Sequence, residues 1–324
     1  MAELYRLYHI AKMYYIDGLK QTDIARMLHI SPMGVSRMLK RAEEEGLVSI
    51  QVRAPTNIDL LAGRKLRVKY PMLKEAIVVH DDGEHNRRRS IGMAAAQYIA
   101  DILVPDAVIG LSWGKTILEC ASLLQPQSMS HVKVAQLTGG FLCSNDYLMM
   151  PSSIVKLASE NLHCDALFFG APMFVTSPEA KKQLMNDSMN NYVLQQARKS
   201  HVNVIGLSPL KESSTISKVE IITEQDRREL LDKGAVGDVA GFFVNAQGEE
   251  IEWSKRGLYV GVDLKTIASA PHVVCLAAET DKARIVDLAV RRKYCSILIT
   301  TDTLANELIT LDETGDQHAN AAIV

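Results

Sequence analysis

Residues 21–50 read QTDIARMLHISPMGVSRMLKRAEEEGLVSI and contain two helical patterns separated by a short turn. The first pattern runs from Gln21 to Leu28 and places the small residue Ala25 where another helix can cross close to the backbone. The second begins at Ser31-Pro32, because serine is a favoured N-cap and proline is favoured at the first helical position, and it ends at Gly46. Two helices joined by a turn of this length predict a helix-turn-helix.

The outward face of the second predicted helix combines residue types that suit contact with duplex DNA. Short side chains lie near its N-terminus, where they can reach base edges, and cations follow further along, where they can reach phosphates. The predicted DNA-binding residues are Gln21, Ser31, Pro32, Met33, Ser36, Arg37, Lys40 and Arg41. Residues 43–45 are all glutamates, which would repel phosphates, so they are placed away from the DNA face. The alternative is a three-helix bundle that binds another protein.

The flanking residues complete the pattern of a small, mainly helical domain. Apolar residues recur at helical spacing over residues 4–16 and predict a preceding helix, which Gly18 ends. Residues 47–52 alternate apolar and polar side chains like a short strand, which predicts a wing. His29 occupies a turn position where glycine is common, and we expect it to adopt a left-handed backbone conformation.

The composition is that of an ordinary globular protein. The 324 residues are 47% hydrophobic and 23% charged, which allows one small and one large domain. The net charge of the chain is −2, but residues 1–53 hold eight lysines and arginines against six acidic residues, the sign expected of a DNA-facing segment. The five cysteines are scattered, and no apolar run approaches the length of a membrane span. A cytoplasmic protein without membrane contact, metal or cofactor is therefore expected.

Downstream of residue 54, strand-like and helix-like segments alternate. A basic helical stretch over residues 57–70 is expected to link the domains or to support oligomerisation, within a segment at 55–75. The expected strands are Ile77–Val79, Ala107–Leu111, Val132–Leu137, Ala166–Phe169, Val202–Leu207, Val273–Ala277 and Ile297–Thr300. Helices are expected between them, for example at Arg88–Leu103, Lys115–Leu124 and Lys282–Arg292. This alternation predicts an α/β fold with a parallel, doubly wound sheet over residues 76–324, after a helix-turn-helix domain at 1–54.

Four loops fall where parallel sheets bind ligands, at the carboxyl ends of strands. They are residues 110–116, 136–140, 234–239 and 279–282. The first reads GLSWGKT, and its small residues allow backbone N–H groups and a helix N-terminus to approach an anion. It is not a nucleotide P-loop, because three residues rather than four separate its glycines. Residues 80–85 (HDDGEH) offer metal-ligand chemistry, but a surface turn is the simpler interpretation.

Over nearly its whole length, the chain resembles the SorC family of sugar-responsive bacterial transcription regulators. The resemblance rests on QTDIARMLHISPMGVSRMLKRAEEEGLVSI, VIGLSWGKT, QLTGG, GAVGDVAGFFVNAQG and DKARIVDLAVRRKYCSILITTDTLANELI, in this order. It implies a C-terminal domain similar to sugar-phosphate isomerases, an operator-DNA partner, assembly into dimers or tetramers, and control by a phosphorylated sugar or polyol. Because this fold is shared with catalysts, a sugar-phosphate isomerase or deaminase with an appended DNA-binding segment is the alternative. No catalytic residue is assigned.

The resemblance also implies roles for individual residues in a ligand pocket. Ser112, Gly114, Lys115 and Thr116 would hold the phosphate together with Lys282, Asp238 would accept hydrogen bonds from hydroxyls, and Gly139 and Gly140 would shape the floor. These residue types agree with the chemistry, because a dianion needs N–H donors and a cation. Two simpler roles are left open, a solvated lysine at the start of a helix for Lys282 and a cap for Asp238.

Two positions depart from the pattern of the family. Glu279 stands where many relatives have glycine, and its carboxylate would oppose a phosphate, so an uncharged polyol is left open as the ligand. Thr138 stands where some relatives have a lysine that forms a Schiff base with a deoxysugar phosphate. Because threonine cannot form an imine, we expect reversible, noncovalent binding.

Overall fold

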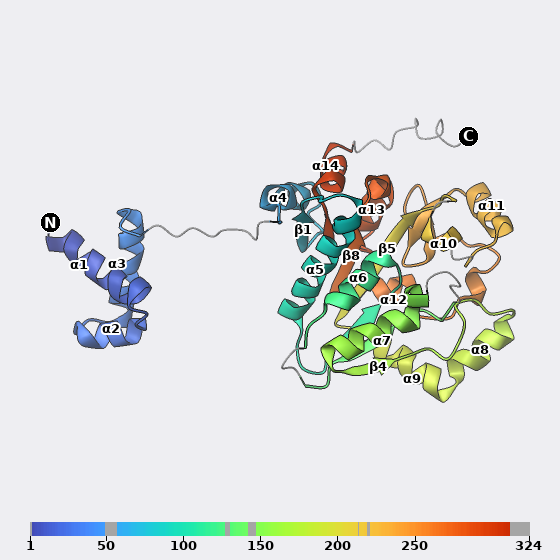
Figure 1. Cartoon of the computed structure of the whole chain (residues 1–324), viewed down its shortest axis with the longest axis horizontal. Helices are drawn as coiled ribbons and strands as arrows, with labels where there is room; N and C mark the ends of the chain where they lie inside the picture. The colour runs from blue at the N-terminus through green and yellow to red at the C-terminus, as the bar shows by residue number, and fades with distance from the viewer. Residues whose placement is uncertain are drawn as a thin grey trace. The chain divides into compact units, whose positions relative to one another are not determined.

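The computed structural model describes residues 2–48, 57–126, 130–141, 147–212, 214–218 and 221–311 (Figure 1). The chain divides into two compact units, residues 1–54 and 55–324. Each unit has a hydrophobic core of its own. Within the described residues, no helix is both long and apolar enough to cross a lipid bilayer.

The first unit is a small helical domain. Its elements are α1 (Ala2–Ala11), which continues into the π-helical turn η1 (Lys12–Ile16), then α2 (Gln21–Met27) and α3 (Pro32–Glu44). Leu7, Ile10, Ile24 and Val35 are among the side chains that form its core. Three helices around one core, with α2 and α3 joined by a short turn, confirm the predicted helix-turn-helix.

The turn between α2 and α3 follows from its sequence. The Oγ atom of Ser31 accepts a hydrogen bond from the Gly34 N–H at 3.1 Å, so serine caps α3 and Pro32 occupies the first turn, as expected. His29 has a φ of 53°, which confirms the left-handed conformation expected there. Ala25 is buried under the crossing helix. The predicted wing lies mostly outside the described residues, because only Leu47 and Val48 of that segment are described.

The second unit is an α/β domain built on one sheet. Its strands are β1 (Glu75–Val79), β2 (Val108–Leu111), β3 (Lys133–Gln136), β4 (Asp165–Leu167), β5 (Val202–Pro209), β6 (Ala235–Val239), β7 (Phe242–Asn245), β8 (His272–Ala277) and β9 (Ile297–Thr301). Within the described residues, the order is β1-β9-β8-β5-β2-β3-β4, with every neighbouring pair parallel. The strands predicted from sequence are confirmed to within one or two residues at each end.

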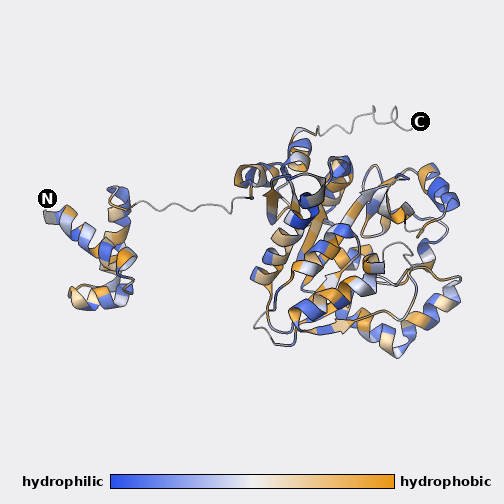
Figure 2. Cartoon of the chain, viewed as in Figure 1, coloured by the Kyte–Doolittle hydropathy of each residue, from blue (hydrophilic) through white to orange (hydrophobic). Residues whose placement is uncertain are grey.

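Helices connect these strands. They are α4 (Leu60–Lys69), α5 (Glu84–Ile102), α6 (Lys115–Leu123), α7 (Pro151–Leu162), α8 (Pro178–Asn186), α9 (Ser188–Ala197), α10 (Thr215–Lys218), α11 (Glu224–Asp232), α12 (Leu264–Ala268), α13 (Ala283–Arg291) and α14 (Asp302–Thr310). Short 3-10 turns are η2 (Tyr147–Met149), η3 (Arg256–Leu258) and η4 (Thr280–Lys282). Every residue of β2 and of β9 is buried, as expected of a parallel sheet covered on both faces. Figure 2 shows these strands as hydrophobic and the helices as mixed.

The strand order reverses direction between β2 and β5. After β2 the chain moves outward through β3 to β4, then returns to place β5 on the other side of β2 and continues through β8 to β9. This reversal is the topological switch point of a doubly wound sheet, where neighbouring loops diverge and leave a crevice at the carboxyl ends of the strands. The fold therefore places a ligand site beside the ends of β2 and β5.

Residues 234–239, which the sequence predicts as a loop, instead contain the whole of strand β6. β6 runs antiparallel to the end of β5 and to β7. β5 extends beyond its parallel neighbours, and its last residues, Leu207 to Pro209, pair with β6. A Cβ atom on Gly237 would lie 2.5 Å from the Ser208 carbonyl oxygen, so the glycine permits the close approach of two strands. The small residues of segment 234–239 therefore allow the pairing of β6 with β5.

The segment predicted as a linker helix belongs to the core of the second unit. In α4, Ala62 and Leu66 are buried, and a Cβ atom on Gly63 would lie 2.5 Å from the Ala76 carbonyl oxygen of β1. Tyr70, at the end of α4, donates a buried hydrogen bond of 2.8 Å to Asp287 on α13. The basic residues of α4 thus share the helix with a buried stripe. A role of α4 in linking the two units or in oligomerisation stays a prediction.

Candidate functional site

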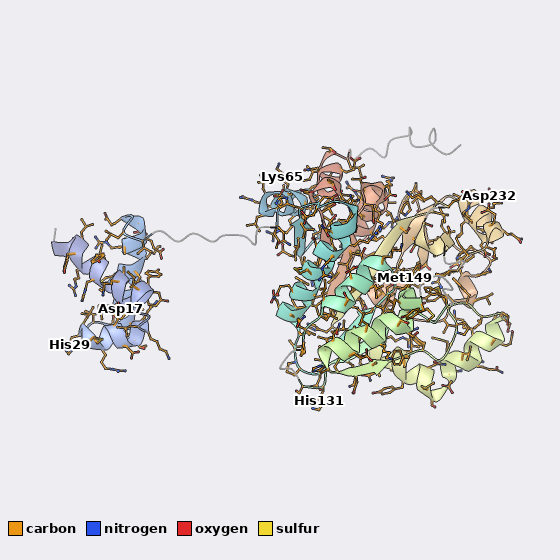
Figure 3. The ribbon with its side chains drawn as sticks, in the orientation of Figure 1. Asp17, His29, Lys65, His131, Met149 and Asp232 are labelled. Carbon is orange, nitrogen blue, oxygen red and sulfur yellow. The ribbon has the colours of Figure 1, made fainter. Side chains whose placement is uncertain are left out.

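The exposed face of α3 carries the side chains predicted to contact DNA. Pro32, Met33, Ser36, Arg37 and Lys40 are exposed, whereas Val35, Leu39 and Ala42 on the opposite face are buried. Gln21, at the start of α2, is half-buried. Figure 3 labels His29, which is exposed in the turn that precedes α3. The face that a helix-turn-helix presents to a major groove is therefore free of core contacts.

The cations of α3 differ in what they contact. Arg41 Nη1 donates a hydrogen bond of 2.8 Å to Glu3 Oε1 on α1, which lowers the pKa of Glu3. Lys40 Nζ lies 3.9 Å from Glu44. Arg37 has no ion-pair partner within the described residues. Arg41 therefore contacts α1 through an exposed ion pair, whereas Arg37 is unpaired among the described residues; the DNA contacts of all three cations stay predictions.

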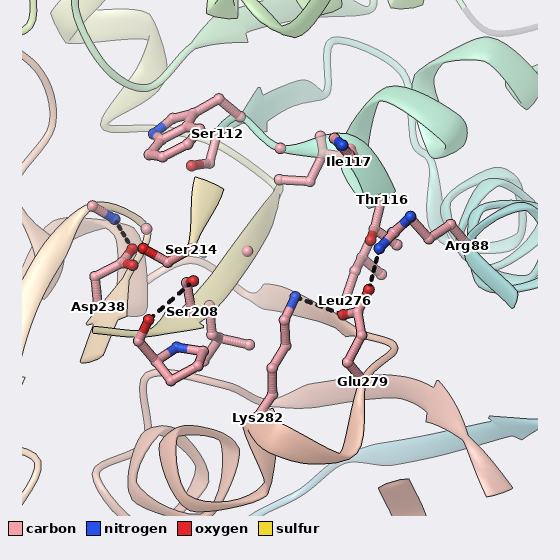
Figure 4. Close-up of a pocket in the computed structure, with 18 of the residues that line it drawn as sticks. Arg88, Ser112, Thr116, Ile117, Ser208, Ser214, Asp238, Leu276, Glu279 and Lys282 are labelled. Atoms are coloured by element: carbon pink, nitrogen blue, oxygen red, sulfur yellow. Dashed lines mark hydrogen bonds and ion pairs between the residues drawn. The ribbon is translucent and has the colours of Figure 1, made fainter. Parts of the chain in front are cut away.

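A pocket of about 200 Å³ lies at the switch point of the second unit (Figure 4). Five segments that are distant in sequence contribute to it. They are residues 112–117 after β2, the end of β5 with Lys211 and Ser214, residues 238–241 at the end of β6 and the following turn, residues 276–282 at the end of β8 and beyond, and Arg88 of α5. The predicted residues Ser112, Gly114, Lys115, Thr116, Asp238 and Lys282 all line it. The structure therefore brings together most of the expected site.

The loop after β2 presents polar groups and a helix end to this pocket. Ser112 and Thr116, which are 2% and 7% exposed, lie two residues before and two residues after Gly114 in the sequence. Gly114 lies at the N-terminus of α6. Its φ of +131° is a backbone conformation that other residues rarely adopt. The unpaired backbone N–H groups of a helix N-terminus favour oxygen-rich ligands.

Gly139 and Gly140 do not line the pocket, which corrects the expectation that they shape its floor. The N–H of Gly139 donates to the Val260 carbonyl at 2.9 Å, and the N–H of Gly140 donates to the Ala171 carbonyl at 2.8 Å. A Cβ atom on Gly139 would lie 2.4 Å from the Pro172 carbonyl oxygen. These glycines allow close backbone packing, and their donors are already used. Thr138, between β3 and these glycines, also lies outside the residues that line the pocket.

Asp238 is a buried acid in the pocket wall. Its side chain is 4% exposed, and Oδ2 accepts a hydrogen bond of 2.9 Å from the Gly241 N–H. Burial raises the pKa of Asp238 to about 7, against the opposing effects of the Gly241 N–H and Lys282. Near neutral pH this carboxyl group is therefore present in both its protonated and its ionised form. The protonated form can donate a hydrogen bond to a ligand hydroxyl, and the ionised form can accept one.

Glu279 connects two cations inside the pocket. Its Oε1 lies 2.5 Å from Arg88 Nη2, and its Oε2 lies 3.0 Å from Lys282 Nζ. Figure 4 shows Arg88 and Lys282 on either side of this carboxylate. Burial tends to raise the pKa of Glu279, but Lys282 and Arg88 together hold it below its usual value. Lys282 is thus a paired residue of the pocket, 19% exposed, and the solvated lysine left open from sequence is wrong.

Sequence reasoning missed several residues of the pocket. Residues 87–89 are three arginines near the start of α5; Arg88 lines the pocket, whereas Arg87 pairs with Asp81 and Arg89 is exposed. Ser208 and Ser214 also line it. Ser208 lies in β5 close to its carboxyl end, so the general rule for parallel sheets could have found it.

The segment His80–Asp82 forms a surface turn. Asp81 Oδ1 accepts a hydrogen bond of 3.0 Å from the Gly83 N–H, and His80 Nδ1 lies 3.0 Å from Asp302 Oδ2. The side chains at 84 and 85, which would complete a metal-ligand set, lie outside the described side chains. No group of three or more histidine, cysteine or acidic residues suited to a metal occurs among the described residues.

Comparison with known proteins matches both units. The family of sugar-binding domains called Sugar-bind matches residues 56–310, and the winged helix-turn-helix DNA-binding family matches residues 17–49. The chain is 25% identical to the deoxyribonucleoside regulator of Bacillus subtilis over 303 residues, covering 92% of this chain and 95% of that protein. It is 25% identical to the transcriptional regulator LsrR of Enterobacter sp. over 307 residues, covering 93% and 92% of the two chains.

Solved structures share the fold. The full-length sorbitol operon regulator SorC from Klebsiella pneumoniae superposes with a TM-score of 0.71 at 23% identity, covering 94% of this chain and 97% of that one. A DeoR family transcriptional regulator from Listeria monocytogenes superposes with a TM-score of 0.70 at 25% identity, covering 76% and 98%. The likeness to the sorbitol operon regulator extends through both units.

Proposed function

The chain belongs to the SorC family of sugar-responsive, DNA-binding transcriptional regulators, and we propose that a polyhydroxylated metabolite in the pocket controls how tightly its α3 helix binds operator DNA. The observation that carries this proposal is the convergence of Ser112, Thr116, Asp238 and Lys282 on one pocket at the switch point. Hydroxyls, a helix N-terminus and a buried acid together match the groups of a sugar or polyol.

The DNA-binding half of the proposal rests on α3. Its short side chains, including Ser36, face outward near the N-terminus, and Arg37 and Lys40 follow on the same exposed surface. In a homo-oligomer, two such helices would enter successive major grooves of a pseudo-palindromic site, with the cations on phosphates. Dimeric or tetrameric assembly and a cytoplasmic location are part of this proposal.

The ligand-binding half rests on reversible contacts. Thr138 offers no amine for a Schiff base, so the ligand is held by hydrogen bonds to groups such as Ser112 and Asp238. The names of similar proteins, a deoxyribonucleoside regulator and a sorbitol operon regulator, support a carbohydrate-derived ligand. Ligand binding changes DNA affinity only by the difference in ligand affinity between the DNA-competent and DNA-incompetent states. The protein is proposed to act without catalysis.

The experiment measures DNA affinity of the full chain by fluorescence anisotropy. Duplexes that the protein selects from a random pool serve as probes, and titrations at several salt concentrations give the salt dependence. Addition of a panel of sugars, polyols and their phosphates is expected to change the affinity for one chemical class. The absence of salt-sensitive binding to every duplex would contradict the proposal, and turnover of a sugar phosphate would favour an isomerase or deaminase instead.

A further inference from the structure

Glu279 is an anion of the chain itself, placed between two cations of the pocket. Arg88 contacts one of its carboxylate oxygens at 2.5 Å and Lys282 the other at 3.0 Å. The Glu279 side chain is 23% exposed, so these contacts are partly shielded from water. Charge-assisted pairs of this kind use the donors that a phosphate would otherwise receive.

The other two cations that line the pocket are not part of the group formed by Arg88, Glu279 and Lys282. Lys211 forms an ion pair with Asp281, which also lines the pocket. Lys115 has no ion-pair partner within the described residues and is exposed at the start of α6. A phosphate dianion that entered between Arg88 and Lys282 would have to displace Glu279, and a partly buried carboxylate without its partners is strongly unfavourable.

One buried atom of a pocket residue lacks a hydrogen bond and suits a hydroxyl. Among the described residues, Trp113 Nε1 is a donor without an acceptor. A buried donor of this kind gains most from a partner. A hydroxyl can donate to a carboxylate oxygen, whereas a phosphate dianion has no proton to donate.

We propose that Glu279 fills the anion position of this pocket and thereby selects an uncharged sugar or polyol over the corresponding phosphate ester. The ligand presents a hydroxyl to Glu279 where a phosphate would otherwise lie. This inference rests on the proposed function and narrows its ligand class.

The test compares the affinity of inorganic phosphate for the wild-type chain and for Glu279→Gln, measured by isothermal titration at pH 8. Glutamine keeps the size of the side chain but removes the charge, so Arg88 and Lys282 become available. Glu212→Gln is the matched control, because it removes one negative charge from an exposed side chain that does not line the pocket. We expect Glu279→Gln to bind phosphate at least about tenfold more tightly than the wild type, and the control to match the wild type. Equal affinities of the wild type and Glu279→Gln, whether both bind or neither does, would overturn the inference.

A second measurement uses the wild type alone and is independent of how the variant folds. Matched pairs such as ribitol with ribitol 5-phosphate and sorbitol with sorbitol 6-phosphate are compared by thermal shift. In any pair that binds, the uncharged member is expected to give the larger shift, and a larger shift with the phosphate ester would overturn the inference. A complete lack of binding would contradict the proposed function instead, while the phosphate titration would still decide the role of Glu279.

Discussion

The surface of α3 and the pocket of the second unit both carry cations, but the two regions differ in whether these cations are paired with acidic side chains. Arg37 is exposed and has no ion-pair partner within the described residues, whereas Arg88 and Lys282 are both paired with Glu279. An exposed cation costs little because water solvates it, and it can exchange bound counterions for DNA phosphates. A cation inside a pocket needs a resident partner. The difference teaches that the acids of a pocket, as much as its cations, determine which ligand enters.

The largest expected effect tests the buried acid of the pocket. Burial raises the pKa of Asp238 to about 7, above its value of roughly 4 in an unfolded chain. The folded protein therefore keeps a proton that the unfolded chain loses, and stability falls as pH rises from about 4 to about 7. Asp238→Asn cannot ionise, so from pH 5 to pH 8 its stability should rise relative to the wild type by about 3 kcal/mol.

Urea unfolding of both proteins at pH 5 and pH 8 measures this difference. If the unfolding free energies of the wild type and Asp238→Asn changed equally with pH, the pKa of Asp238 would not be raised in the folded protein. The pocket would then differ less from the exposed surface of α3 than the burial of Asp238 suggests.

The next effect separates two arginines of α3. Arg37→Ala should weaken DNA binding by about 1–3 kcal/mol and lower the salt slope by about one phosphate contact. Arg41→Ala is the matched control, since the Arg41 guanidinium already binds Glu3 at 2.8 Å. Its effect on DNA affinity should stay below about 1 kcal/mol. Anisotropy titrations at several salt concentrations give both quantities, and equal losses would mean that the pairing with Glu3 yields to DNA.

The smallest effect concerns the start of α3. Ser31→Ala removes the hydrogen bond from the Gly34 N–H and should destabilise the first unit by about 1 kcal/mol. Ligand affinity should be unchanged, because each unit has its own core. Thermal unfolding and ligand titration of the full chain measure both. A change in ligand affinity would show that the two units are energetically coupled through the folding of α3.

The sequence predicted the fold well where local patterns are strong. Ser31-Pro32 and the periodicity around Ala25 were sufficient for the helix-turn-helix, and the alternation of strands and helices was sufficient for the parallel sheet. The pattern at 234–239 was misleading, because small residues occur both in loops and where strands approach closely. Gly237 belongs to the second case, and only the extension of β5 beyond its neighbours shows this.

The pocket was predictable where its residues follow directly after strands. Ser112 and Thr116 were found in this way, and Lys282 follows the same rule. Arg88 was not, because its role depends on a contact with Glu279 across 191 positions of sequence. Gly139 was assigned wrongly, since a glycine after a strand can serve a ligand or serve backbone packing, and its contact with Pro172 exists only in the folded chain.

The buried hydrogen bond between Tyr70 and Asp287 ties the middle of α13 to the end of α4. The first residue of α13, Ala283, follows Lys282 of the pocket directly, and Asp287 near its middle holds the end of α4. Residues 285–290 of α13 are buried without interruption, so the helix has no soft point at which a displacement could be absorbed. The position of Lys282 is therefore linked through one rigid helix to the end of α4, which is the first helix described after the DNA-binding unit.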